Sequence, residues 1–248
     1  MLYLFRIILT TIWVSLSCLI GILIGLVRPF DPRNTKISAE LISWSRHILG
    51  IEIEIRNKEI FDQARPCVFI SNHQDNLDIV PGGFSLPHST VTIGKKAIIF
   101  LPFFGQFFWL SGNILIDRKN RKSAFETMDV ATRAIKEKKL SIWIMPEGTR
   151  SKGRGLLPFK KGPFVMAIRA QVPIVPISFS TYKNYIHLNK WKAGKIIIEV
   201  NSPISTLGLT SEDINSIKDQ AYNVMKESIL KSEKELEKDS VIEVKNKT

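Results

Sequence analysis

A histidine and an aspartate, His73 and Asp78, are the residues of this chain whose types and spacing best suit acid–base chemistry. They lie in the stretch FISNHQDNLDIVP, directly after an apolar run that is typical of a buried strand. Histidine is the commonest general base near neutral pH, and its other ring nitrogen needs an orienting acceptor. On one continuous helix the two side chains would point about 140° apart, so they can meet only in a strand-to-helix turn. Such a pair could deprotonate a hydroxyl group, although the spacing alone is also compatible with an idle polar pair.

Two later segments, each directly after an expected strand, could bind a phosphate group. Arg118 follows GNILID, and Glu147, Gly148, Thr149 and Arg150 follow the strand that ends in WIM. A guanidinium group can grip a phosphate through two parallel hydrogen bonds. The glycine lets backbone N–H groups approach closely, and the threonine supplies a hydroxyl group. Glu147 is a poor neighbour for a phosphate, so we expect it to contact an arginine or a substrate hydroxyl.

Charge and cysteine content narrow the classes of partner. Lys95, Lys96 and Lys160 lie near other loops and could add to a positive field around a substrate. The chain has 35 Lys and Arg residues against 23 Asp and Glu residues, a formal net charge of +12. This excess indicates an anionic partner: nucleic acid, an anionic membrane surface or a phosphorylated substrate. Cys18 and Cys67 give no disulfide framework, and no zinc-type spacing occurs, so we expect no metal site.

The elements that must position these residues form an alternating pattern of strands and helices. Short apolar or alternating runs predict strands at 51–57, 68–71, 90–94, 113–117, 140–145, 173–180 and 195–200. Helix caps are predicted at Ser123 with Glu126 and at Thr210 with Asp213. The pattern predicts an α/β fold: a central mixed sheet of about seven strands flanked by helices. Ligands bind such sheets at the carboxyl ends of the strands, where the candidate residues lie.

The segment from Ile7 to Val27 carries no charge and predicts a membrane-anchoring helix. As a helix it would be about 31 Å long, against a hydrocarbon core of roughly 30 Å. A secretory signal fits less well, because no convincing small-residue cleavage site follows. Whether the helix spans the bilayer or folds back is left open by the sequence. Arg28, Arg33 and Lys36 follow it, while Arg6 precedes it, a slight excess that favours a cytoplasmic location for the rest of the chain.

Two further segments could touch lipid. Residues 36–50 have an apolar helical face that could lie on the bilayer or pack on the rest of the protein. Residues 97–116 are uncharged and rich in aromatic side chains, but Pro102 and Gly105 interrupt them, so a clean transmembrane helix is not expected. They form either a buried core element or an aromatic surface touching lipid, and we favour the aromatic surface.

Four short blocks in this order, NHQDNLD, GNILIDR, MPEGTRS and VPIVPI, resemble the blocks of the glycerolipid acyltransferases. The resemblance covers most of the chain and points to the bacterial lysophosphatidic acid acyltransferases. It implies transfer of a fatty acyl group from acyl-CoA or acyl-carrier protein, as donor substrate, to the 2-hydroxyl of a lysophosphatidate. No bound cofactor is implied. Asp75, Leu115 and Met145 depart from residues common in the family, which weakens any inference about headgroup or chain preference.

The resemblance also assigns roles to the candidate residues. It implies that His73 is the base and Asp78 its orienting carboxylate. It implies that the glycerol phosphate is held by Arg118, Glu147, Gly148, Thr149 and Arg150, with Lys95, Lys96 and Lys160 as possible further contacts. No acyl-enzyme is expected, because Cys67 lies in a predicted buried strand. The implied location is the bacterial inner (cytoplasmic) membrane.

The expected organisation has three parts: a membrane anchor with an amphipathic helix at 1–50, a catalytic domain at 51–230 and a charged tail at 231–248. Rival functions remain. The acceptor could be glycerol-3-phosphate, another lysophospholipid or a lipid that becomes acyloxy-linked. A non-catalytic phospholipid-binding membrane protein would use the same cations. A nucleic-acid binder fits the charge, but the anchor and the lack of a binding motif argue against it.

Overall fold

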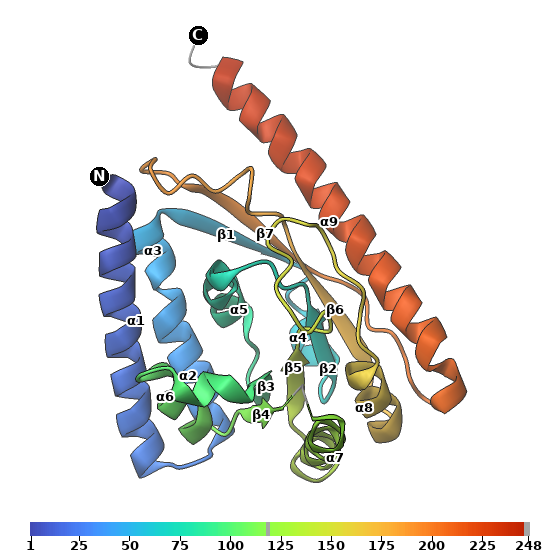
Figure 1. Ribbon diagram of the computed structural model, residues 1–248. Coiled ribbons are helices and arrows are strands. Elements are labelled where there is room, and N and C mark those ends of the chain that lie inside the picture. Colours follow the sequence, from blue (N-terminus) through green and yellow to red (C-terminus); the bar gives the residue numbers. More distant parts are fainter. Residues whose placement is uncertain (118–119, 246–248) are drawn as a thin grey trace.

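A seven-stranded sheet organises the chain in the computed structural model, which describes residues 1–117 and 120–245 (Figure 1). Within this part the strands lie in the order β1-β7-β6-β2-β5-β3-β4. All neighbouring strands are parallel except β6 and β7. The strands are β1 (Ile51–Arg56), β2 (Val68–Ser71), β3 (Thr90–Lys95), β4 (Ile114–Ile116), β5 (Ser141–Ile144), β6 (Ile174–Phe179) and β7 (Gly194–Val200). The predicted α/β fold with a mixed sheet is confirmed.

Strand β2 lies in the centre of the sheet, between β5 and β6. All four of its residues, Val68–Ser71, are buried, as expected for a strand that is covered on both faces. Because β2, β5, β6, β3 and β4 run parallel, their carboxyl ends meet at one edge. The segments that follow β2 and β5 therefore begin side by side at this edge.

Helices cover both faces of the sheet (Figure 1). They are α1 (Leu2–Val27), α2 (Pro32–Ser43), α3 (Ser45–Leu49), α4 (Ile60–Gln63), α5 (Ile79–Ser85), α6 (Phe104–Leu110), α7 (Arg121–Lys138), α8 (Gly162–Ala170) and α9 (Ile214–Lys245). Short 3-10 turns lie at Asn76–Asp78 (η1), Lys96–Phe100 (η2) and Ser211–Asp213 (η3). On one face, residues of α7, α8 and α9 share an apolar core with the strands. On the other face, a second core includes Phe61 of α4 and Val80 of α5.

Helix α1 lies outside these layers, against α2 and α6 (Figure 1). A small cluster of Cys18, Ile42, Phe107 and Phe108 fills this contact. Glycine at position 21 allows the close approach, since a Cβ atom there would lie 2.7 Å from Phe107 Cδ2. Within the described residues, α1 is the one helix long and apolar enough to cross a membrane by length and composition.

Both ends of α1 are tied to the rest of the protein. Near the amino end, the guanidinium group of Arg6 is buried and donates to the carbonyl oxygens of Leu188, Lys190 and Trp191 at 2.5–3.0 Å. Beyond the carboxyl end, the Phe30 N–H donates to the Leu110 carbonyl at 2.8 Å. Arg6 is therefore part of a packed contact, so it does not act as the free flanking charge that the sequence argument about orientation used.

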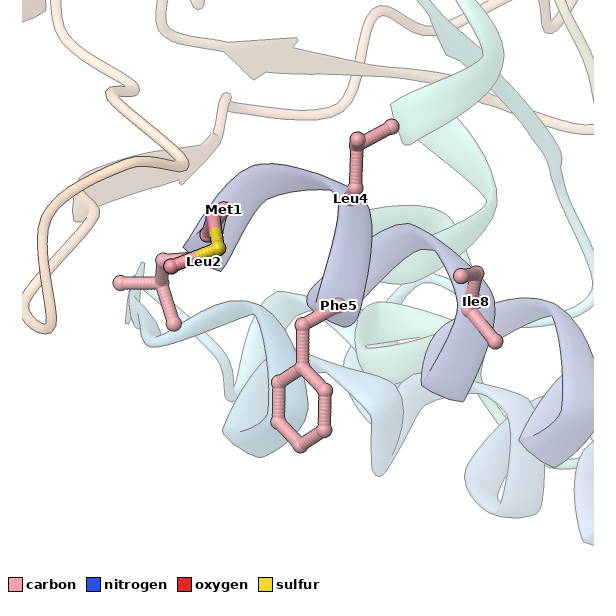
Figure 2. A pocket seen from close by; sticks show the side chains of 5 residues that line it. All are labelled: Met1, Leu2, Leu4, Phe5 and Ile8. Carbon is pink, nitrogen blue, oxygen red and sulfur yellow. The ribbon is translucent and has the colours of Figure 1, made fainter.

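The outer side of α1 is apolar and exposed. An open apolar hollow at its amino end is lined by Met1, Leu2, Leu4, Phe5 and Ile8 (Figure 2). Further along, the same helix exposes Ile12, Leu16, Leu19, Ile20, Leu23 and Leu26. A soluble protein rarely exposes so large a continuous apolar surface, so this side is suited to contact with lipid.

The aromatic segment after β3 divides between the two predicted environments. Phe107 and Phe108 are buried against α1 and α2, whereas Phe100, Phe103 and Trp109 are exposed. The segment is thus a core element on one side of α6 and an aromatic surface on the other.

Helix α2 buries a face of small polar residues, Thr35, Ser38 and Ser43, along with Ile42. The Thr35 hydroxyl donates to the Ser111 carbonyl at 2.9 Å. The apolar face predicted for 36–50 is half-buried, except that Trp44 is exposed. This segment therefore packs on the protein and still presents apolar surface outside.

One of the two predicted helix caps is wrong. Thr210 and Asp213 form the predicted capping box, in which Asp213 Oδ2 accepts from the Thr210 N–H at 2.8 Å. The cap of α7 is Asn120, whose side chain accepts from the Ser123 N–H at 3.1 Å. Asparagine is among the strongest N-cap residues, so the helix begins three residues before the predicted position.

The predicted division of the chain at residue 230 stays a prediction. Helix α9 passes this position without a break and continues to Lys245. Its first turns bury Ile217, Ala221 and Met225. The charged residues after Lys231 therefore lie on the same helix as far as Lys245.

Candidate active site

The turn after β2 is held by the side chain of Asn72. Its side chain is buried, accepts from the Phe179 N–H at 2.8 Å and donates to the Phe179 carbonyl at 2.9 Å. This pair of bonds fixes the end of β2 to the end of β6. The chain can then leave the sheet at His73 in a defined direction.

His73 and Asp78 lie face to face in this turn. The distance between His73 Nδ1 and Asp78 Oδ2 is 2.5 Å. Asp78 ends the short turn η1, which Asp75 caps by accepting from the Leu77 N–H at 2.7 Å. The predicted strand-to-helix turn is therefore present and brings the two side chains together. Since an ionised carboxylate only accepts hydrogen bonds, Nδ1 carries the proton and Nε2 is left as the acceptor.

The carboxylate of Asp78 is buried and densely hydrogen-bonded on one side. Its Oδ2 also accepts from the Gln74 N–H at 2.7 Å and from the Asp75 N–H at 3.2 Å. Burial raises the pKa of neighbouring Asp75, and the charge of Asp78 raises it further. Three donors on one oxygen hold the carboxylate in a fixed orientation toward His73.

Glu147 takes a different position from the predicted one. It is 2% exposed; its Oε1 accepts from the His73 N–H at 2.6 Å and its Oε2 accepts from the Leu157 N–H at 3.0 Å. The expected partners were an arginine or a substrate hydroxyl, and the structure instead gives both oxygens to the backbone. The reason is that the loop after β5 passes directly beside the turn after β2. Burial raises the pKa of Glu147 to about 7.

The loop that contains Glu147 pairs with the His73 turn along its length. The Ser151 N–H donates to the His73 carbonyl at 2.7 Å, and the Lys152 N–H donates to the Gln74 carbonyl at 2.9 Å. These backbone bonds place the segment after Glu147 next to His73. They bring together two predicted motifs that are more than seventy residues apart in the sequence.

Gly148, Thr149 and Arg150 follow Glu147 in this loop. Gly148 has φ of +71°, in the left-handed region that favours glycine, so the chain can turn sharply there. Thr149 and Arg150 are exposed. The positive charge of Arg150 lies close enough to Asp75 to lower its pKa against the effect of burial. The guanidinium group is therefore near the His73 turn and open to a ligand.

The predicted lysines are distributed around the same edge of the sheet. The aliphatic stem of Lys160 passes 3.5 Å from the position of a Cβ on Gly148, so this lysine borders the Glu147 loop. Lys95 and Lys96 are exposed at the end of β3, two strands from β2. Arg118 lies outside the described residues.

Two expectations from the sequence were that Cys67 is not a nucleophile and that the protein has no metal site. Cys67 is fully buried, and burial raises the pKa of its thiol to about 12, so it is not a reactive thiolate. Within 1–117 and 120–245, no group of three or more His, Cys, Asp or Glu residues could hold a metal ion.

Gln74 and Tyr182 also belong to the site and were missed by sequence reasoning. Gln74 Oε1 accepts from the Tyr182 N–H at 3.1 Å, and Gln74 Nε2 donates to the Ser180 carbonyl at 2.9 Å. The one available signal was the crowding of amide side chains on either side of His73. No local pattern indicated that the segment after β6 would meet them.

Comparisons with known proteins found similar sequences. The model of the family described as Acyltransferase matches residues 52–180. A protein of Haemophilus influenzae named 1-acyl-sn-glycerol-3-phosphate acyltransferase is 40% identical over 238 residues, which is 96% of this chain and 99% of that protein. The Escherichia coli protein of the same name is 38% identical and covers 95% of this chain and 96% of its own length.

A solved structure supports the fold. The crystal structure of a 1-acyl-sn-glycerophosphate acyltransferase from Thermotoga maritima superposes with a TM-score of 0.72. The match covers 93% of this chain and 94% of that chain, at 19% sequence identity. Because the identity is low, this likeness bears on the architecture alone.

Proposed function

This chain belongs to the acyltransferase family, and from that premise we propose that it acylates 1-acyl-sn-glycerol 3-phosphate at its free 2-hydroxyl to give phosphatidic acid. The observation that carries the proposal is the 2.5 Å contact between His73 and Asp78, beside the loop that presents Arg150. A base and a phosphate-binding cation at one edge of the sheet fit an acceptor with a hydroxyl group and a phosphate.

The proposed reaction is a direct transfer. Asp78 keeps the proton on Nδ1 of His73, so Nε2 accepts the proton of the substrate hydroxyl. The oxygen attacks the thioester carbonyl of the donor, the new C–O bond forms and the C–S bond breaks. The imidazolium then gives its proton to the leaving thiolate, which restores the neutral histidine. General-base assistance of this kind contributes about 10²–10⁴ in rate.

The proposed phosphate site consists of Arg150, Gly148 and Thr149. The guanidinium group of Arg150 can bind two phosphate oxygens, and the left-handed turn at Gly148 lets the chain turn sharply before Thr149 and Arg150. Lys160 borders the same loop and can add positive charge. Arg118 is a further proposed contact through the family resemblance alone. Lys95 and Lys96 are proposed through the resemblance and their exposed position at the end of β3.

For Glu147 we propose a positioning role in place of direct substrate binding. Both of its oxygens accept backbone N–H groups, one of them that of His73. The carboxylate therefore joins the His73 turn to the loop that carries Arg150. This bridge sets the distance between the base and the phosphate site.

The proposed donor is acyl-CoA or acyl-carrier protein, because either supplies the thioester that the mechanism needs. The two donors can be compared in one assay with the same acceptor. Detergent-solubilised protein would be given each donor at equal concentration, and phosphatidic acid would be measured. If the protein formed no phosphatidic acid with either donor, the thioester mechanism would be contradicted.

We also propose that α1 lies along one membrane surface and does not span it. Arg6 and Phe30, at its two ends, contact the same globular body. The helix has 26 residues and is about 39 Å long. If it spanned the bilayer, the globular body that contacts both of its ends would have to lie within the hydrocarbon core. The exposed apolar side of α1, together with Phe100, Phe103 and Trp109, can enter the lipid and bring the site to its amphiphilic substrates. The proposed location is the cytoplasmic face of a bacterial inner membrane.

The membrane arrangement can be tested by labelling. The variants Tyr3→Cys and Asp31→Cys place thiols near the two ends of α1, while native Cys18 and Cys67 are buried. In sealed inverted vesicles, which present the cytoplasmic face outside, a membrane-impermeant maleimide should react with both variants, and labelling of neither would contradict the proposed face. Labelling of one end only would mean that the helix spans the bilayer.

The catalytic proposal is tested by acyl transfer to several acceptors. Purified wild-type protein and His73→Ala would be given a radiolabelled donor with lysophosphatidate, glycerol-3-phosphate or lysophosphatidylcholine. We expect lysophosphatidate to be preferred and His73→Ala to lose activity while it still binds vesicles. Near-normal turnover by His73→Ala would refute the assignment of His73 as the base. A preference for another acceptor would refute the assignment of lysophosphatidate as the substrate. A wild-type protein that binds lipid without turnover would be a binding protein.

A further inference from the structure

The side of Asp78 that faces away from His73 has a neighbour to which the reaction assigns no role. Asp78 Oδ2 receives three N–H groups, but Oδ1 is buried and has no hydrogen-bonding partner within the described part of the chain. The hydroxyl oxygen of Tyr182 is in the same state: it is buried, and it too lacks a partner there. Leaving a buried polar atom without a partner costs about 1–3 kcal/mol, so two such atoms in one place require an explanation.

Gln74 links the two residues, and the carboxylate of Asp78 acts directly on the Tyr182 hydroxyl. Its backbone N–H donates to Asp78 Oδ2, and its side-chain oxygen accepts from the Tyr182 N–H. The Tyr182 ring is 4% exposed and belongs to the core against which Leu77 and Ile79, the neighbours of Asp78, also pack. One residue thus fixes the backbone of Tyr182 and the carboxylate of Asp78 in a common arrangement.

The chemistry of the two atoms is complementary. A carboxylate oxygen can only accept, and a tyrosine hydroxyl can donate. We propose that the Tyr182 hydroxyl donates to Asp78 Oδ1 and that Tyr182 is a positioning residue of the His73–Asp78 pair. This inference rests on the proposed function for its catalytic meaning. The bond completes the surroundings of the carboxylate, with His73 on one oxygen and Tyr182 on the other.

The Tyr182 hydroxyl keeps its proton near neutral pH and can act as a donor. Burial raises the pKa of Tyr182 well above its ordinary value, and the negative charge of Asp78 and the approach of the hydroxyl to that carboxylate raise it further. A phenol in this environment keeps its proton. It can therefore donate to Asp78 both when His73 is neutral and when His73 is protonated during the reaction.

Two consequences follow for the base. The bond stops the carboxylate from rotating, so Oδ2 remains opposite Nδ1. It also draws negative charge toward Oδ1, which weakens the pull of Asp78 on the imidazole proton. Loss of the hydroxyl should leave a more basic pair, so the acidic limb of the kcat/KM profile should move to higher pH. The other charged or titratable groups around the pair are Asp75, Glu147 and Arg150.

The test compares Tyr182→Phe with a matched control, Tyr185→Phe, in the full-length protein. Tyr185 lies three residues further along the same segment, and its hydroxyl donates to the Glu233 carbonyl at 3.4 Å. We expect Tyr182→Phe to lower kcat about tenfold, equivalent to about 1.4 kcal/mol, with both KM values unchanged. We expect the acidic limb to rise by about half a pH unit. Tyr185→Phe should match wild type in kcat, in both KM values and in the position of the acidic limb.

A spectroscopic readout makes the result independent of the substrate. The proton on His73 Nδ1 gives a low-field NMR signal that reports its bond to Asp78. We expect this signal to shift in Tyr182→Phe and not in Tyr185→Phe, without any ligand. If lysophosphatidate proved to be the wrong acceptor, this shift would still appear. Failure of the proposed function and failure of this inference are therefore distinguishable.

A second substitution avoids the chance that phenylalanine disturbs the fold. Incorporation of 3-fluorotyrosine at position 182 keeps the ring and strengthens the donor, so the acidic limb should move to lower pH. Opposite movements in the two variants are the expected outcome. A pH profile and a low-field signal that match wild type in both variants would overturn the proposal. So would a lower Tm in Tyr182→Phe with no change in either readout.

Discussion

Replacing Glu147 by glutamine should separate stability from activity, because this buried carboxylate costs stability while it orders the loops of the site. Glu147 is 2% exposed, and burial raises its pKa from 4.5 to about 7. A carboxyl group with a higher pKa in the folded chain binds its proton more tightly there. Its contribution to stability is therefore fully present below about pH 4.5 and is lost as the pH rises through about 7.

The size of this effect follows from the two pKa values. The shift corresponds to about 3 kcal/mol, which solvent screening at this loop reduces to about 2 kcal/mol. Glutamine has nearly the same shape and no charge, so Glu147→Gln and wild type should unfold alike near pH 4.5. At pH 8 the variant should be more stable by about 2 kcal/mol, a rise in Tm of about 4–8 °C for a chain of this size. Thermal unfolding followed by circular dichroism measures the Tm of the two proteins near pH 4.5 and at pH 8.

Activity should move in the opposite direction. Glutamine has one acceptor oxygen, so either the His73 N–H or the Leu157 N–H loses its partner and the two loops come apart. A displacement of about 1 Å can cost about 100-fold, so we expect kcat to fall about 10- to 100-fold while the KM for lysophosphatidate stays unchanged.

The control is Glu126→Gln on an exposed side of α7, which removes the same charge and should change neither stability nor kcat. A higher KM for lysophosphatidate with kcat retained would refute the positioning role and restore direct substrate contact. A variant less stable than wild type at pH 8 would refute the electrostatic reasoning.

Three other substitutions test the rest of the site and the membrane helix. Asp78→Asn should lower kcat about 10²- to 10⁴-fold in steady-state kinetics, because an amide no longer holds the His73 tautomer; a loss below threefold would contradict its orienting role. Arg150→Ala should raise the KM for lysophosphatidate at least about tenfold and leave the donor KM unchanged, and equal increases would argue against a phosphate site. Gly21→Leu should push α1 away from Phe107 and lower the Tm by several degrees, whereas an unchanged Tm would contradict the close packing.

Local sequence predicted the elements well because their signals are short-range. Each of the seven expected strands is present and ends within two residues of its predicted bounds, since alternation and apolar runs mark strands directly. The turn that joins His73 to Asp78 was also predictable, because five residues rich in turn and cap formers leave few conformations that bring the two together. The cap of α7 was misplaced because two good cap residues, Asn120 and Ser123, stand three positions apart.

The amino acid types alone determined which groups could act: an imidazole with a carboxylate, an arginine after a glycine, and an apolar helix at the start of the chain. Only the tertiary structure decided their partners. It gave Glu147 to two backbone N–H groups, joined the Tyr182 N–H to the Gln74 side chain, and buried Arg6 among three carbonyl oxygens. These contacts join segments brought together by the order of strands in the sheet, with β2 between β5 and β6. That order results from packing the whole core, and no stretch of sequence encodes it locally.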